Sequence, residues 1–123
     1  MGSNVTNMLY LFSYSDFNGD ISNWDVSNVT TMEAMFKRSK FDGNLSNWDV
    51  SNVRYMQTMF ACSKFNNDIS NWDVSNVTTM EYMFVYSEFD GDISKWDVSN
   101  VKFKLNIFYN CPIEEKYKPK FKN

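Results

Sequence analysis

The 123-residue sequence has no histidine, and it has only two cysteines and two prolines. Without histidine, the chain lacks the commonest general base of enzymes and the commonest metal ligand of proteins. Cys62 and Cys111 are too few for a zinc site and too far apart for a CxxC motif. These absences predict a chain that is not an enzyme and that carries no cofactor and no metal.

Long hydrophobic runs are also missing, since no apolar stretch approaches the length that spans a bilayer. The first residues, Met1-Gly2-Ser3, contain neither a charged leader nor an apolar segment, so we expect no signal peptide. Hydrophobic residues make up 43% of the chain and aromatic residues 18%, which excludes a disordered chain. We therefore expect one domain with its own core.

Positive charge is scarce in most of the chain. Residues 1–101 hold six lysine or arginine residues against thirteen acidic residues, a net charge of −7. Residues 102–123 hold six lysines against two glutamates, a net charge of +4. Because phosphate binding needs a basic face, the acidic body disfavours nucleic acid as a partner. The basic tail could contact an anionic surface, although a solubilising end is the favoured interpretation.

The sequence is dominated by an internal repeat. Trp24, Trp48, Trp72 and Trp96 follow one another at equal intervals without an insertion, which defines a 24-residue period. The same register holds for the aspartates Asp25, Asp49, Asp73 and Asp97, the methionines Met32, Met56 and Met80, and the phenylalanines Phe17, Phe41, Phe65 and Phe89. A unit of this size cannot bury its apolar side chains alone, so stacked copies are expected to share one continuous core.

The repeat predicts a solenoid with a different structure on each face. The segment 47–51 alternates polar and apolar residues, which predicts a strand with Trp48 and Val50 pointing inward and a parallel sheet built from successive strands. The segment 53–60 spaces its apolar residues by three, which predicts a short helix or 3-10 turn on the opposite wall. Residues 1–111 then form about four and a half repeats, and residues 112–123 form a C-terminal cap with a basic tail.

The pattern I/L-S-x-W-D-V-S-N-V-x-x-M-x-x-M-F-x-x-S-x-F resembles the repeat of BspA-like leucine-rich-repeat bacterial surface proteins and lipoproteins, over roughly residues 3–111. The best-known form of that repeat ends in Ala-Phe-x-x-Cys. Here Met59-Phe60-Ala61-Cys62-Ser63 stands in its place, with Ser in the cysteine role, and Cys111 alone keeps the cysteine. The resemblance implies a right-handed leucine-rich-repeat solenoid, a role in protein binding or cell adhesion, and a cell-surface or secreted location. It implies no particular ligand, since such families share scaffolds rather than partners.

The two ends of the repeat array differ. The segment 116–122 alternates lysine with Tyr117, Pro119 and Phe121, which predicts a cap over the last turn. The first repeat begins at Ser3-Asn4-Val5 with nothing comparable before it. Either a longer array has been cut at this point or another chain buries the edge, and we expect self-association through this bare N-terminal edge.

Each repeated position forms a column along the solenoid. The tryptophan column is expected inside the core, and the column of Asn28, Asn52, Asn76 and Asn100 is expected to form an amide ladder to the backbone. The column Asp25, Asp49, Asp73 and Asp97 has three open interpretations: hydrogen bonds to the neighbouring serines, a calcium ladder, or an acidic docking stripe.

Positions at which the repeats disagree are free to recognise a partner. Among them are Arg38, Arg54, Tyr55, Tyr82 and Tyr86, which are residue types that dominate binding energy at interfaces. We predict a non-catalytic module that binds a protein partner through these residues or through the acidic column. The alternative is a structural spacer or a self-assembling subunit of a larger array.

Overall fold

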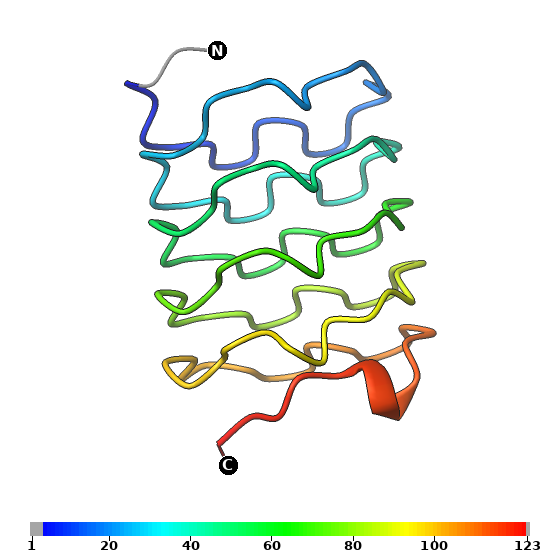
Figure 1. The fold of residues 1–123 in the computed structure, drawn as a ribbon. Helices are drawn as coiled ribbons and strands as arrows, with labels where there is room; N and C mark the ends of the chain where they lie inside the picture. The colour runs from blue at the N-terminus through cyan, green and yellow to red at the C-terminus, as the bar shows by residue number, and fades with distance from the viewer. Residues whose placement is uncertain (1–3, 123) are drawn as a thin grey trace.

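The computed structural model describes residues 4–122, so Met1-Gly2-Ser3, on which the expectation about a signal peptide depends, lies outside the described residues. The chain winds into stacked coils that descend from the N-terminus to the C-terminus (Figure 1). Single parallel bridges join successive coils, from Asn7 to Thr31, Tyr55, Thr79 and Phe103, and so define five coils. The predicted solenoid with a 24-residue unit is confirmed.

One arc of every coil carries the hydrogen bonds that hold the stack together. We call it the ladder arc, and it comprises residues 7–14, 31–38, 55–62, 79–86 and 103–110. Every second amide of this arc donates at 2.8–3.1 Å to a carbonyl of the next coil, one position short of a full repeat along the chain. The amide of Phe60, for example, donates to the carbonyl of Met83. Intervening amides close turns within their own coil, as Met59 does onto Met56.

Two residues in every ladder arc have a positive φ, between 51° and 59°. They are Tyr10 and Tyr14, Ala34 and Arg38, Thr58 and Cys62, Tyr82 and Tyr86, and Asn106 and Asn110. A type II turn needs a positive φ at its third residue, and Thr58 holds this position in the turn closed by Met59 and Met56. None of the ten is a glycine, although glycine adopts this conformation at the least cost.

The predicted parallel sheet at segment 47–51 is wrong. Trp48 and Val50 do point inward and Asp49 outward, as the alternation predicted. The backbone amides, however, are used within the coil: Trp48 donates to the carbonyl of Leu45, and Ser51 donates to the carboxylate of Asp49. Amides that close local turns cannot also form a ladder between strands, and no extended strand occurs within residues 4–122.

The helix or 3-10 turn predicted at segment 53–60 is also wrong. The residues spaced by three are buried as expected, since Val53, Met56 and Met59 are fully enclosed. Successive tight turns produce this periodicity too, and the left-handed Thr58 prevents them from coiling into a helix. Within residues 4–122 the helical structure is η1, a 3-10 turn at Glu115–Tyr117 in the tail.

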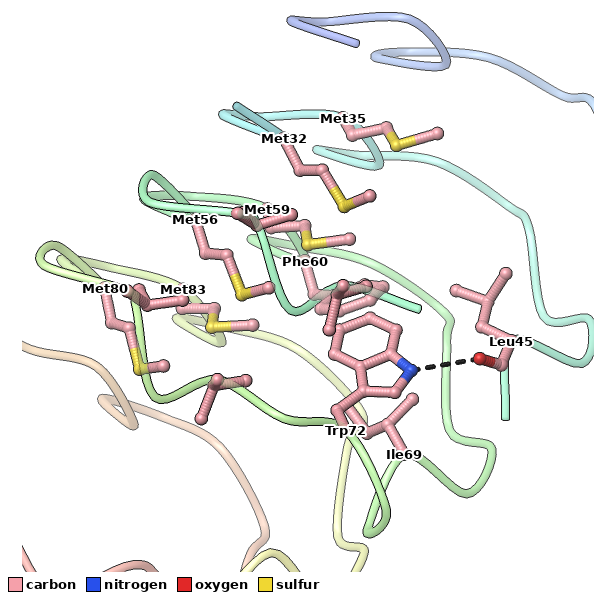
Figure 2. Packing of buried hydrophobic residues seen from close by; sticks show 14 of the residues in the cluster. Met32, Met35, Leu45, Met56, Met59, Phe60, Ile69, Trp72, Met80 and Met83 are labelled. Atoms are coloured by element: carbon pink, nitrogen blue, oxygen red, sulfur yellow. Dashed lines mark hydrogen bonds between the residues drawn. The ribbon is translucent and has the colours of Figure 1, made fainter. Parts of the chain in front are cut away.

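Aromatic and methionine columns fill the space inside the coils. Phe36, Phe60 and Phe84 stack with ring centroids 5.5–5.6 Å apart, and Trp72 lies 6.3 Å from Trp96 with nearly parallel rings. Figure 2 shows the methionines of successive coils lying beside one another in the same core. Trp48, Trp72 and Trp96 are therefore inside the core, as predicted, whereas Trp24 is only partly buried.

Polar side chains complete the links between coils. The indole N–H of Trp48, Trp72 and Trp96 donates at 3.0 Å to the carbonyl of Ile21, Leu45 and Ile69, respectively. Figure 2 shows this bond for Trp72. The amides of Asn52, Asn76 and Asn100 donate to the carbonyls of Ser27, Ser51 and Ser75 in the preceding coil. The predicted asparagine ladder is confirmed for these three residues.

The tail runs beneath the fourth coil, opposite the last ladder arc (Figure 1). The amide of Ile93 donates to the carbonyl of Tyr117, one full repeat later, and Ile113 is buried one full repeat after Phe89. The segment 112–122 thus continues the repeat spacing and supplies the second arc of the fifth coil.

Candidate functional site

The exposed aromatic side chains gather on the ladder arcs. Tyr10, Tyr14, Tyr82 and Tyr86, all at positions of positive φ, have 51%, 67%, 37% and 55% of their surface exposed. A residue in the left-handed conformation of this arc can therefore project a large ring to solvent. The scaffold beneath these rings is fixed by the hydrogen bonds between coils.

The five predicted binding residues all lie on this arc or beside it. Tyr55, Tyr82 and Tyr86 are exposed ladder-arc residues of the third and fourth coils, and Arg54 precedes the third arc by one position. Arg38 occupies the second left-handed position of the second coil. Arg54 and Tyr55 are neighbours in the chain, Tyr82 and Tyr86 share the fourth coil, and Arg38 lies in the second coil.

The structure pairs two of the five with residues that the sequence reasoning missed. The guanidinium of Arg38 lies over the ring of Tyr14, 5.8 Å from its centroid, and Tyr86 meets Tyr109 edge to face at 5.5 Å. A signal for Tyr10 and Tyr14 existed, because they stand three whole repeats before Tyr82 and Tyr86. We call the following set the tyrosine face: Tyr10, Tyr14, Arg38, Arg54, Tyr55, Tyr82, Tyr86 and Tyr109.

The column of Asp25, Asp49, Asp73 and Asp97 has a structural role. Each carboxylate accepts two hydrogen bonds from the serine two residues later in the chain. The serine hydroxyl donates at 2.6 Å and the serine backbone amide at 3.0 Å. These bonds lower the pKa of Asp25, Asp73 and Asp97, because the charged carboxylate is the better acceptor. The negative charge of Asp97 opposes this effect on the pKa of Asp73. Of the three interpretations of this column, the hydrogen bond to serine is the one that the structure displays.

A second column repeats the same turn and includes one uncharged acceptor. Asp20 and Asp92 accept hydrogen bonds from Ser22 and Ser94 in the same way. In the second coil Asn44 replaces the aspartate and accepts from the amide and hydroxyl of Ser46 at 2.9 and 2.7 Å. An uncharged oxygen therefore forms the same pair of hydrogen bonds.

Two substitutions of Asp73 distinguish the contribution of its hydrogen-bond acceptor from that of its charge. We expect Asp73→Asn to keep the free energy of unfolding at pH 7 within about 0.5 kcal/mol of the parent, because the amide oxygen remains an acceptor. Asp73→Ala should lose about 1 kcal/mol, because the amide of Ser75 then has no partner in the turn. Urea unfolding measures both values, and an equal loss in the two variants would contradict the role of the turn.

The same hydrogen bonds predict acid sensitivity. The pKa of six carboxyl groups is lowered in the folded chain by their serine partners: Asp20, Asp25, Asp68, Asp73, Asp92 and Asp97. Each group adds stability fully above its ordinary pKa of 3.8, and this stability is lost as the pH falls through the lower folded value. We expect the melting temperature to fall below about pH 4 and Asp73→Asn to reduce that fall.

Within residues 4–122, no three histidine, cysteine, aspartate or glutamate side chains are grouped as metal ligands would be. In the same part of the chain, no helix has the length and apolar composition needed to cross a bilayer.

Comparison with known proteins adds one finding. A family model described as "Mycoplasma protein of unknown function, DUF285" matches residues 2–87 and, in a second overlapping match, residues 61–117. The two matches overlap, as expected when one family pattern fits several repeats. Among curated proteins and among solved structures, none matches the chain.

Proposed function

We propose that this chain, which belongs to the family described as Mycoplasma protein of unknown function, DUF285, is a non-catalytic protein-binding or adhesion module that uses its tyrosine face. The observation that carries the proposal is the placement of four exposed tyrosines at left-handed backbone positions: Tyr10, Tyr14, Tyr82 and Tyr86. A cell-surface or secreted location and a right-handed winding are parts of the same proposal.

A tyrosine at such a position destabilises the fold. The left-handed conformation costs a residue with a Cβ about 1–2 kcal/mol, and asparagine and glycine tolerate it best. The fifth coil uses asparagine at both positions, as Asn106 and Asn110. Because the scaffold does not need tyrosine there, a role for the ring in recognition explains why it is present.

The chemistry of the face suits protein recognition. Tyrosine and arginine supply most of the binding energy in typical interfaces, since they combine a large apolar surface with a polar end. Arg38 and Lys37 both lie over the ring of Tyr14, which holds that ring in a defined position. A surface already ordered before binding loses little entropy when a partner docks.

Selected peptide ligands provide a test. Peptides would be selected from a random phage-displayed library on the immobilised chain, and their affinity would be measured for the parent, Tyr82→Asn and Tyr86→Asn. We expect each substitution to weaken binding by about 1–2 kcal/mol. The same substitutions should raise the melting temperature, because asparagine accepts the left-handed conformation more readily.

Matched control variants distinguish the effect of losing a tyrosine ring from the effect of placing asparagine at a left-handed position. Thr58→Asn alters the same column without removing a ring, so it should raise stability and leave binding unchanged. Asp49→Asn and Asp73→Asn test the acidic column Asp25, Asp49, Asp73 and Asp97 as the alternative face. If selected peptides lost affinity only in the aspartate variants, or if the tyrosine variants bound normally, the tyrosine face would be rejected.

A structural role as a self-assembling subunit or spacer is the second candidate. The observation that favours it is the difference between the two ends of the stack, where the first coil lacks lysine and arginine and the last coil is rich in lysine.

A further inference from the structure

We propose that the two ends of the solenoid bind each other, so that the last coil of one copy stacks on the first coil of a second copy. The interaction surface is the open edge of each terminal ladder arc, and the partner is a second copy of this chain. This inference rests on the second candidate function, self-assembly, and not on the tyrosine face.

The hydrogen bonds of the ladder have a direction, and this makes the two ends complementary. At the four alternate ladder positions of every described pair of successive coils, the earlier coil donates through its amides and the later coil accepts through its carbonyls. At the start of two arcs, Tyr55 and Phe103 instead donate to the earlier coil, at Thr30 and Thr78. The first coil therefore has carbonyls without a backbone donor within residues 4–122, at Asn7, Leu9, Leu11 and Ser13. The last coil has amides without a backbone acceptor in the same range, at Lys104, Asn106, Phe108 and Asn110.

The two rows match in register. Within the chain, each ladder amide donates to a carbonyl one position short of a full repeat later, as the amide of Met8 does to the carbonyl of Thr31. In the proposed stack, each residue of the second copy lies five whole repeats after the same residue of the first copy. The amide of Lys104 then faces the carbonyl of Asn7 in the second copy. The remaining three amides face the carbonyls of Leu9, Leu11 and Ser13 in order. The junction would repeat the four ladder bonds found between every pair of described coils.

Charge selects this pairing over the alternatives. The first coil, residues 3–26, contains three aspartates and neither lysine nor arginine, a side-chain charge of −3. The last coil, residues 99–122, contains six lysines and two glutamates, a charge of +4. Two first coils, or two last coils, would place like charges and identical hydrogen-bonding groups opposite each other. Only the head-to-tail arrangement satisfies both requirements.

Apolar exposure is concentrated where the junction would form. Of the eleven large apolar side chains that are exposed, eight belong to the first or last coil. Leu11 is 43% exposed, whereas Met35, its counterpart one coil later, is fully buried. Leu105 and Phe103 are likewise exposed at the other end. A second copy would cover Leu11 as the neighbouring coils cover Met35, whereas Tyr55, the counterpart of Phe103 inside the stack, remains 43% exposed.

Two lysines at the open end of the last coil oppose the junction: Lys104, and Lys118, whose ammonium lies over the ring of Phe108 at 5.4 Å. Lys104 is the first of them. It stands in the column formed by Met8, Met32, Met56 and Met80, and its ammonium donates to the carbonyl of Lys122 at 3.1 Å. A coil stacked beneath it would remove this charge from water, which is unfavourable. The association is therefore reversible, and Lys104→Met is expected to strengthen it by at least tenfold.

A charge-swap experiment tests the proposal. One variant makes the first coil basic and the other makes the last coil acidic, at exposed positions. The basic variant carries Thr6→Lys, Asp16→Lys and Asn23→Lys. The acidic variant carries Lys102→Glu, Lys120→Glu and Lys122→Glu. Thr6→Lys and Asn23→Lys suit the fold, because Arg54 and Lys95 already occupy the equivalent positions in other coils. Asp16→Lys also removes the exposed ion pair of Asp16 with Lys40, whose charged atoms are 3.4 Å apart.

Sedimentation velocity over a concentration series at low salt gives the result. The parent is expected to form chains of copies, each triple variant alone to remain monomeric, and an equimolar mixture of the two to associate again. Added salt should weaken the parent's association. A parent that stays monomeric at millimolar concentration, variants that associate as the parent does, or a mixture that fails to associate would each overturn the proposal. Circular dichroism of each variant verifies that its fold is retained.

Discussion

Replacement of Phe60 by alanine is expected to lower the free energy of unfolding by about 3–5 kcal/mol, because it removes a fully enclosed ring from the centre of the stack. Phe60 lies between Phe36 and Phe84, at 5.6 and 5.5 Å, and contacts Phe65 at 4.5 Å. The coils above and below are fixed by ladder hydrogen bonds, so they cannot close the cavity. Urea unfolding followed by tryptophan fluorescence measures the loss.

Phe12→Ala is the matched control, since Phe12 occupies the same column in the first coil. Its ring stacks on Phe36 at 5.7 Å but is only partly buried. We expect a loss of about 1–2 kcal/mol, because less apolar surface leaves the core. Equal losses at the two positions would mean that the ring column does not contribute more stability inside the stack than at its end.

The residues that face the core could be predicted because the repeat displays them many times. Each copy of the unit is an independent sample of the same environment, so a position that is always apolar must be buried. Trp48, Val50, Val53 and Met56 were assigned to the core on this basis, and all four are buried. The asparagine ladder followed from the same logic, since a polar residue that recurs needs a recurring partner.

The backbone conformation could not be predicted in the same way. Inward and outward alternation at segment 47–51 fits a strand, but it fits equally a chain of turns that directs the same side chains inward. The decisive feature is the pair of left-handed residues in each coil. Because Tyr, Ala, Arg, Thr, Cys and Asn fill these positions and glycine does not, composition gave no sign of a positive φ.

The sequence predicted the residue types of the candidate site, but only some of the residues that belong to it. The disagreement between repeats located Tyr82 and Tyr86, because variation in an otherwise strict repeat marks the surface. Tyr10 and Tyr14 were missed because the first repeat was considered only as the end of the array. Its residues were not aligned with the equivalent positions of the later repeats. Contacts between coils then connect Tyr14 with Arg38 and Tyr109 with Tyr86.

Trp72→Phe is expected to lower the free energy of unfolding by about 2 kcal/mol, from the smaller ring and from the lost indole hydrogen bond together. The indole N–H of Trp72 donates to the carbonyl of Leu45 in the preceding coil, so the substitution removes a link between coils as well as apolar surface. Trp24→Phe supplies the control. Its ring is partly buried, and within residues 4–122 no carbonyl accepts from its indole N–H, because the equivalent acceptor position lies outside these residues.

We expect Trp24→Phe to cost less than about 1 kcal/mol, since only part of the ring's burial is affected. The difference between the two tryptophans measures what a coil gains from having a neighbour on its N-terminal side. Thermal and urea unfolding of both variants give this difference directly. If Trp72→Phe were no more destabilising than Trp24→Phe, the indole bond would contribute nothing to stacking, and the coils would be held by the ladder arc and the core alone.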